Sequence, residues 1–324
     1  MTLTRRTLTR TLAALAVPAL VLAGCASTPS GHGEVVIGLT YTPDVQFAPF
    51  YVAEAKGYYE DSGAEVTLRH HGASESLFGA LEAGEEHLVV AGGDEMLQAR
   101  SAGVPVVSVG ALYEDYPAAL IVPEDSPIQG PQDLAGHSIG LPGPYGQTYF
   151  FLLVLLAEAG LTEAQAGVEY IGFTQQAALS AGHVDAVIGF TNNDVVQFEH
   201  AGTPVRTITP EQLPLAGSGI GAHEDVDAAA LAAVLAATYR GVQDVIDDPE
   251  GAVAIAAEHV PGLAAPATQE AALATLEATI ELYGGADGHQ DPALWEQMAA
   301  FMGEQGLLEG EVDPAAAMTN EFLD

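Results

Sequence analysis

Residues 80–94 read ALEAGEEHLVVAGGD and residues 178–192 read ALSAGHVDAVIGFTN, so the same order of residue types recurs 98 positions later. The recurrence continues with GVPV at 103–106 and GTPV at 202–205. Each copy predicts a helix, a glycine stop that fits a helix C-cap, a short apolar strand and a polar loop. Any α/β protein repeats this order of elements, but a register shared over about 25 residues favours two lobes of similar build.

Segments rich in β-branched residues alternate with helical segments outward from this stretch. Strands are predicted at residues 34–39, 65–70, 87–91, 106–112, 119–123, 138–141, 168–171 and 186–189. Helices are predicted between them at residues 50–59, 74–83, 94–102, 148–159 and 175–181. Buried strands separated by helices indicate an α/β fold with mostly parallel pairing.

The composition changes near residue 225, beyond which Ala, Leu, Glu and Gln predominate. A loop is predicted over 213–221, and only helices after it, at residues 227–246, 250–259, 268–283 and 292–305. These late helices are expected to bury their apolar faces on the lobe that is built first. We therefore predict one lobe from residues 34–120 plus 218–324 and a second from residues 121–217. Two crossings of the chain between lobes make a hinge, with an interlobe cleft that can close.

The N-terminus has the features of a secretory signal. Three arginines precede a short apolar run, and Cys25, the one cysteine of the chain, directly follows Leu-Ala-Gly. This pattern predicts a signal peptide over residues 1–24, and its last residues resemble the bacterial lipobox. Because a single cysteine cannot form an intramolecular disulfide, we expect lipid at Cys25 and a lipidated flexible linker over 25–33. The alternative is a plain signal peptide with a chance cysteine.

The chain is strongly acidic, with 44 acidic and 8 basic residues and a formal net charge of −36. Such a surface repels nucleic acid and anionic lipid headgroups, so no nucleic-acid partner is expected and the membrane is reached through the lipid only. The scarcity of arginine also disfavours a ligand whose anionic group needs an arginine clamp. Most of the acidic side chains are expected to be a solvated surface.

Ligands of open α/β sheets bind beyond the carboxyl ends of the strands. The residues that follow the predicted strands are aromatic, amide-bearing, acidic or glycine. Aromatic faces stack on a flat ring, amides and carboxylates hold its nitrogens, and glycines let the backbone approach, although each aromatic residue could equally serve packing. The candidate ligand-binding residues are Tyr41, Phe47, Gly93, Asp94, Tyr113, Tyr145, Thr148, Phe173, Phe190, Asn192, Asn193 and Asp194.

The segment at residues 47–59, FAPFYVAEAKGYY, resembles a segment of the bacterial substrate-binding lipoproteins of ABC importers. Tyr-Thr-Pro at 41–43 and VPVVSV at 104–109 belong to the same resemblance, which covers roughly residues 34–220. That branch also holds binders of thiamine-pyrimidine precursors, riboflavin, alkanesulfonates, taurine and nitrate. The resemblance implies a two-lobed type II periplasmic-binding-protein fold with a hinge and an interlobe cleft. It also implies an extracytoplasmic protein that delivers a small molecule to a permease, here a monomer anchored to the cell membrane by lipid at Cys25.

Residues 189–194 resemble the vitamin-precursor members of this family, in which an aromatic residue and an acid in this loop hold the heterocycle. The resemblance implies stacking on Phe190 and a polar clamp from Asn193 and Asp194. The expected ligand is thus a small planar nitrogen heterocycle, either a thiamine-type pyrimidine or a flavin. An alkanesulfonate, taurine or nitrate is the alternative, against which the arginine-poor loops count.

An extracytoplasmic enzyme is the remote alternative. Fungal relatives make the thiamine pyrimidine with an iron-binding cysteine cluster, whereas this chain has no cysteine other than Cys25. His70 and His71 are adjacent, so on a strand they face opposite ways and cannot share a metal ion. Ser138 and Ser180 have no obvious histidine partner. We therefore predict no catalytic residue, no metal and no cofactor.

Overall fold

A computed structural model describes residues 33–72 and 75–323 of the chain. The predicted signal peptide, Cys25 and all but the last residue of the predicted linker lie outside these residues. The described strands form two five-stranded sheets, with the orders β2-β1-β3-β10-β4 and β7-β6-β8-β5-β9. The domain boundaries predicted from the sequence stay a prediction.

The first sheet is mixed. β1 pairs in parallel with β2 and β3, whereas β10 pairs antiparallel with both β3 and β4. The carboxyl ends of β1, β2, β3 and β4 therefore meet at one edge of the sheet. Its strands are β1 (Glu34–Leu39), β2 (Glu65–His70), β3 (Leu88–Gly92), β4 (Val106–Ala111) and β10 (Ser218–His223).

The second sheet has the same design. β6 pairs in parallel with β7 and β8, and β5 pairs antiparallel with β8 and β9. The prediction of mostly parallel pairing therefore holds with one reversed strand in each sheet. The strands are β5 (Ala118–Pro123), β6 (Ile139–Leu141), β7 (Val168–Tyr170), β8 (Ala186–Phe190) and β9 (Val205–Ile208).

The loop predicted over residues 213–221 is wrong at its end, because β10 begins at Ser218. A β-carbon on Gly219 would lie 2.6 Å from the carbonyl oxygen of Gly110, and one on Gly221 would lie 2.8 Å from Val106. β10 is an interior strand between β3 and β4, and only glycine fits the close approach. The glycines that indicated a loop are thus a consequence of tight sheet packing.

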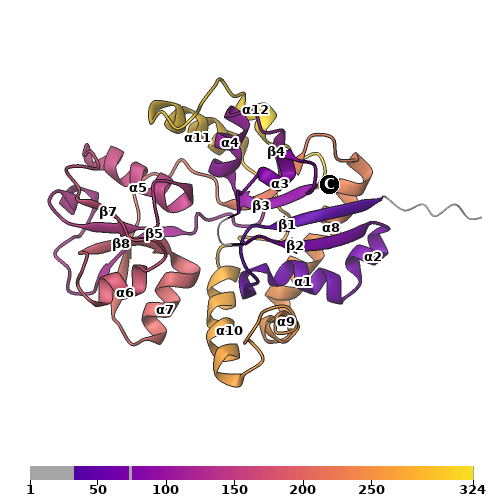
Figure 1. Cartoon of the computed structure of the whole chain (residues 1–324), viewed down its shortest axis with the longest axis horizontal. Helices are drawn as coiled ribbons and strands as arrows, with labels where there is room; N and C mark the ends of the chain where they lie inside the picture. The colour runs from indigo at the N-terminus through magenta and orange to yellow at the C-terminus, as the bar shows by residue number, and fades with distance from the viewer. Residues whose placement is uncertain (1–32, 73–74, 324) are drawn as a thin grey trace, which may run out of the picture. The chain divides into compact units, whose positions relative to one another are not determined.

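Helices cover both faces of each sheet (Figure 1). Along β5, Leu120 packs in one apolar cluster with α5, and Ile121 packs in another with Phe198 of α7, as the two-residue period of a strand requires. The helices of the second sheet are α5 (Gly146–Ala159), α6 (Gln175–Ser180), α7 (Val196–His200) and the short 3-10 helix η2 (Pro131–Leu134). A π-helical turn, η3 (Thr191–Val195), connects β8 to α7.

The remaining helices either connect the strands of the first sheet or come after β10, its last strand in the chain. They are the 3-10 helix η1 (Val45–Phe47), α1 (Ala48–Ala55), α2 (Tyr58–Ser62), α3 (Gly79–Glu82), α4 (Gly93–Ser101), α8 (Ala228–Asp247), α9 (Pro249–Ala256), α10 (Pro266–Ile280), α11 (Pro292–Glu304) and α12 (Pro314–Ala317). The helix predicted over 50–59 is two helices, because Gly57 takes a left-handed conformation with φ 73°. The helix predicted over 74–83 is confined, within the described residues, to α3.

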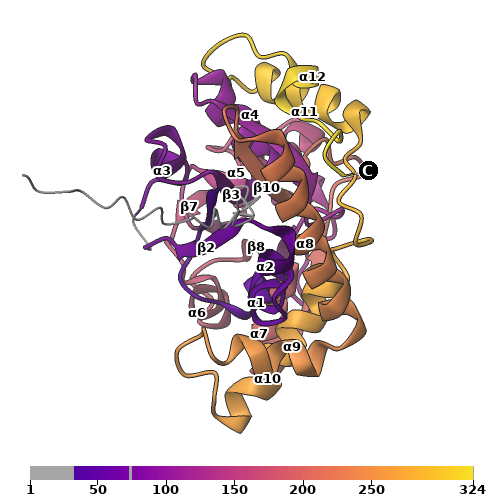
Figure 2. The same ribbon diagram turned by 90° about the vertical axis from the view of Figure 1, so that its right-hand side faces the viewer.

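Helix α8 is the one described helix whose length and apolar composition would allow it to span a membrane. More than half of that stretch is buried, and the helix runs along α1 and α2 (Figure 2). Val234 and Leu235 are fully buried in the core of the first sheet. α8 is therefore a core helix that packs on strands formed earlier in the chain, as predicted for this helix.

Replacing Gly241 of α8 with alanine is expected to lower the free energy of unfolding by about 1–3 kcal/mol. The added β-carbon would lie 2.2 Å from the carbonyl oxygen of Pro49 and would push α8 away from α1. Gly303→Ala in α11 is the matched control, since its β-carbon meets nothing within 4 Å and alanine favours the helix. Urea unfolding measures both variants, and equal effects would contradict the close packing.

Candidate ligand-binding site

A cavity of about 1060 Å³ lies where loops from the carboxyl ends of strands in both sheets come together. Loops after β1, β3 and β4 contribute from the first sheet, and loops after β6, β7 and β8 contribute from the second. The start of β10 and Tyr283, which follows α10, complete the lining. The two sheets therefore build one site together.

Ten of the twelve candidate residues line this cavity: Tyr41, Phe47, Tyr113, Tyr145, Thr148, Phe173, Phe190, Asn192, Asn193 and Asp194. The exposed fractions of Tyr41, Tyr145 and Phe173 are 47%, 56% and 67%. Large apolar rings are rarely this open to solvent in a folded protein, and here they gather at one concave site. Such rings are available to stack on a flat ligand.

Gly93 and Asp94, the other two candidates, do not line the cavity. The side chain of Asp94 is fully buried and accepts hydrogen bonds from the Tyr116 hydroxyl at 2.6 Å and the Glu95 amide at 2.8 Å. Burial, and then the neighbouring Glu95 carboxylate, raise the pKa of Asp94 well above its usual value. Asp94 therefore stabilises the first turn of α4 from inside the protein.

Glu95 is the acid that this turn presents to the cavity. Its Oε2 accepts a hydrogen bond from the Gly92 amide at 2.9 Å, which is the reciprocal half of a capping box at the start of α4. Burial raises the pKa of Glu95. Because the N-cap residue is glycine, the sequence lacks the Ser or Thr of a full capping box, and nothing in it singled out Glu95.

Asp194 lies in the π-helical turn η3, a type of distortion that is frequent at functional sites. Its Oδ2 accepts a hydrogen bond from the Phe190 amide at 2.7 Å, and a β-carbon on Gly189 would lie 2.7 Å from the same oxygen. Burial raises the pKa of Asp194 to about 6, although the Phe190 amide opposes the shift. The carboxylate thus accepts one hydrogen bond from the backbone and lies at the cavity.

Asn192 connects the two parts of the site. Its Nδ2 donates to Thr279 Oγ1 of α10 at 3.0 Å and, more weakly, to Gln46 Oε1 at 3.4 Å. Asn192 is 1% exposed. Both amide protons therefore have partners in the protein, which favours a positioning role for Asn192 over direct contact with a ligand.

The lining is acidic. Carboxylates of Asp44, Glu75, Glu95, Asp194 and Glu309 line the cavity, whereas the described lining residues include no lysine, arginine or histidine. Burial raises the pKa of Asp44, which the Gln46 amide opposes by donating to its Oδ1 at 3.0 Å. This charge disfavours an anionic ligand and favours one that donates hydrogen bonds.

Arg69 does not line the cavity, and its guanidinium is already paired with carboxylates, one of which, Glu75, does line it. The guanidinium forms hydrogen-bonded ion pairs with Glu75 and with the fully buried Glu86. The His71 Nε2 also contacts Glu86, at 2.9 Å. Within residues 33–72 and 75–323, no group of three or more His, Cys, Asp or Glu side chains is placed to hold a metal ion.

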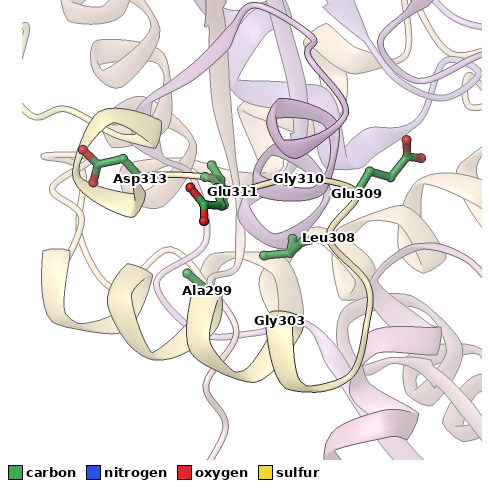
Figure 3. A pocket seen from close by; sticks show the side chains of 8 residues that line it. Ala299, Gly303, Leu308, Glu309, Gly310, Glu311 and Asp313 are labelled. Carbon is green, nitrogen blue, oxygen red and sulfur yellow. The ribbon is translucent and has the colours of Figure 1, made fainter.

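A second hollow, of about 790 Å³, lies between α11 and the segment at residues 308–313. Figure 3 shows the side chains of Glu309, Glu311 and Asp313 pointing in different directions there. Aromatic and amide side chains are absent from its described lining. This hollow therefore lacks the groups that would hold a ring, and the larger cavity is the candidate site.

Comparison with known proteins agrees with this geometry. Residues 44–252 match the sequence family described as NMT1/THI5 like. The chain is 33% identical to the riboflavin-binding protein RibY of Chloroflexus aurantiacus over 90% of this chain and 86% of RibY. It is 25% identical to the formylaminopyrimidine-binding protein of Halalkalibacterium halodurans over 90% of this chain and 93% of that protein.

One full-length relative is an enzyme by name. The 4-amino-5-hydroxymethyl-2-methylpyrimidine phosphate synthase of Legionella pneumophila is 23% identical over 90% of this chain and 92% of its own.

Among solved structures, the periplasmic aliphatic sulphonate binding protein SsuA of Escherichia coli superposes with a TM-score of 0.70 and 19% identity, covering 88% of this chain and 92% of SsuA. The fold is therefore the two-lobed periplasmic-binding-protein fold, as predicted.

Proposed function

The chain belongs to the NMT1/THI5-like family, and on that premise we propose that it is the extracytoplasmic binding protein of an ABC importer with a flavin of the riboflavin type as ligand. The observation that carries the proposal is the lining of the cavity: exposed aromatic rings and carboxylates from both sheets, without a cationic side chain among the described residues. Rings stack on the flat tricycle, and carboxylates accept hydrogen bonds from its imide N–H and from the hydroxyls of its side chain.

The size of the cavity favours a flavin over a single pyrimidine ring. About 1060 Å³ is slightly above the usual range of about 300–1000 Å³ for small-molecule sites. A flavin has three fused rings and a polyhydroxylated chain, and the polar side chains around the rings suit that chain. The relative with 33% identity is a riboflavin-binding protein by name, which adds support. A formylaminopyrimidine is the second candidate, supported by the relative with 25% identity.

Two other classes of function are less well supported. An alkanesulfonate would place its anionic group among five carboxylates, of which Glu75 is paired with Arg69, and no arginine lies in the described lining itself. An enzyme that makes the thiamine pyrimidine is disfavoured because the iron-binding cysteine cluster implied by the resemblance has no counterpart, Cys25 being the one cysteine. We therefore infer that the chain binds its ligand without converting it.

The proposed mechanism is capture followed by closure. One lobe, residues 34–120 with 218–324, and the other, residues 121–217, would close on the ring, and the closed form would dock on a permease. Ligand shifts the open–closed equilibrium by the difference between its affinities for the two forms. Asn192, which hydrogen-bonds Thr279 and Gln46, would link the two lobes as they close.

Calorimetric titration of the protein from residue 26 onward tests the ligand class. Riboflavin is expected to bind, a formylaminopyrimidine to bind more weakly, and taurine and nitrate not to bind. Binding of taurine or nitrate alone would remove the heterocycle proposal. Binding of the pyrimidine alone would keep the site and replace the flavin by the second candidate.

The proposed lipid anchor has a separate test. Cys25→Ser removes the thiol that would carry the lipid, so the variant protein is expected in the soluble extracytoplasmic fraction and the wild type in the membrane fraction. Riboflavin affinity is expected to be unchanged, because the described site starts at Thr40. A variant that stays with the membrane to the same extent would contradict anchoring at this residue.

A further inference from the structure

Two buried polar atoms at the cavity have no hydrogen-bond partner in the protein. Among the described residues, the Nε2 of Gln147 and the hydroxyl of Tyr283 are the two such side-chain atoms, and both residues line the cavity. Gln147 is 7% exposed and Tyr283 is 4% exposed. A buried donor without an acceptor is costly and uncommon in a folded protein. Two of them at one site indicate acceptors that a ligand brings.

The side chain of Gln147 is held by its oxygen, which leaves the amide nitrogen without a hydrogen-bond partner in the protein. Its Oε1 accepts a hydrogen bond from Ser218 Oγ at 3.1 Å, and its backbone carbonyl accepts one from the Tyr116 hydroxyl at 2.8 Å. A β-carbon on Gly92 would lie 2.9 Å from Gln147 Cγ, so the glycine makes room for the side chain. The amide is thus oriented by the protein and still has both protons to donate.

Tyr283 reaches the same cavity from the other part of the chain. It follows α10 and packs in the core of the first sheet, with its ring 5.8 Å from the ring of Tyr113. Burial raises the pKa of Tyr283 well above its usual value, so the hydroxyl keeps its proton and can donate. The residue was missed by sequence reasoning because the C-terminal helical segment gave no sign of facing a ligand.

We propose that Gln147 and Tyr283 are the donor pair that binds acceptor atoms of the ligand. The proposal rests on the proposed function and specifies it: the site selects a neutral heterocycle that carries carbonyl or ring-nitrogen acceptors as well as N–H donors. The carboxylates bind the donors of that ring, and the two neutral donors bind its acceptors. Neutral donors can bind the acceptors of an uncharged ligand, and the acidic lining disfavours an anionic one.

Tyr283→Phe tests the proposal, because it removes the hydroxyl and little else. Riboflavin, followed by quenching of its fluorescence, is expected to bind about five- to tenfold more weakly. The melting temperature of the ligand-free variant is expected to be unchanged or higher, since a buried hydroxyl without a partner is removed. Tyr239→Phe is the matched control: its hydroxyl donates to the Ala111 carbonyl at 2.8 Å and does not line the cavity. That control should melt lower and bind riboflavin as the wild type does.

A second pair of variants addresses Gln147. Gln147→Met keeps the volume and removes the donor, whereas Ser218→Ala removes only the hydrogen bond that orients the amide. Riboflavin affinity is expected to fall about tenfold in Gln147→Met and by less than threefold in Ser218→Ala. If Tyr283→Phe and Gln147→Met both bind riboflavin as tightly as the wild type does, the proposal of a donor pair is overturned. The proposed function would still stand. Failure of the wild type to bind riboflavin or the pyrimidine would overturn both.

Discussion

The double variant Tyr145→Ala/Phe173→Ala will bind riboflavin about 100-fold more weakly than the wild type and will unfold at the same urea concentration. Both rings line the cavity from the second sheet, and both are more than half exposed in the ligand-free protein. Stacking on an aromatic ring contributes about 1–3 kcal/mol to binding of a flat heterocycle, and two rings together give about two powers of ten. Because neither ring is buried in the fold, stability has little reason to change.

Tyr170→Ala provides the matched control for this double variant. Tyr170 lies on β7 of the same sheet and is 51% exposed, but it does not line the cavity, and its hydroxyl donates to Glu163. Loss of this ring should leave riboflavin affinity within about twofold of the wild type. If the control weakens binding as much as the double variant does, stacking at the cavity is not the cause.

The strands and helices were predictable where their pattern is local. Strands β1 and β2 begin and end at the predicted residues, and the four late helices lie within a few residues of their predicted bounds. Strand β10 was missed because its glycines are required by close contact with β3 and β4, which are more than 100 residues earlier in the chain. A one-dimensional pattern cannot distinguish such a glycine from one in a loop.

The candidate site was predictable where its residues follow strands that could themselves be predicted. Residues within three positions of the ends of β1, β4, β6, β7 and β8 do line one cavity. Glu95 was not among the candidates, although the first turn of α4 directs the Asp94 carboxylate inward and leaves that of Glu95 at the cavity. Tyr283 was not predictable, since no strand precedes it and its approach to the cavity depends on how α10 packs.

Asp194→Asn is expected to change the pH dependence of both stability and binding. The pKa of Asp194 is raised in the folded protein to about 6 from an ordinary value of 3.8, so the folded state binds more protons than the unfolded state between these pH values. The contribution of the Asp194 carboxyl to the stability of the wild type is therefore fully present below about pH 4 and is lost as the pH rises through 6. Asparagine can still accept from the Phe190 amide and never ionises. The variant should gain stability relative to the wild type over this window, by up to about 3 kcal/mol, in urea unfolding at pH 4, 6 and 8.

Binding should respond in the opposite sense, because ligand donors need the ionised carboxylate. At pH 8 the variant is expected to bind riboflavin at least about tenfold more weakly, since a charge-assisted hydrogen bond is replaced by a neutral one. As the pH falls below 6, the wild-type carboxylate takes up a proton and its affinity should approach that of the variant. An anionic ligand would instead bind the variant more tightly at pH 8. Calorimetric titrations at pH 5 and 8 therefore separate the two ligand classes, and a wild-type affinity that is the same at both pH values would show that Asp194 does not accept from the ligand.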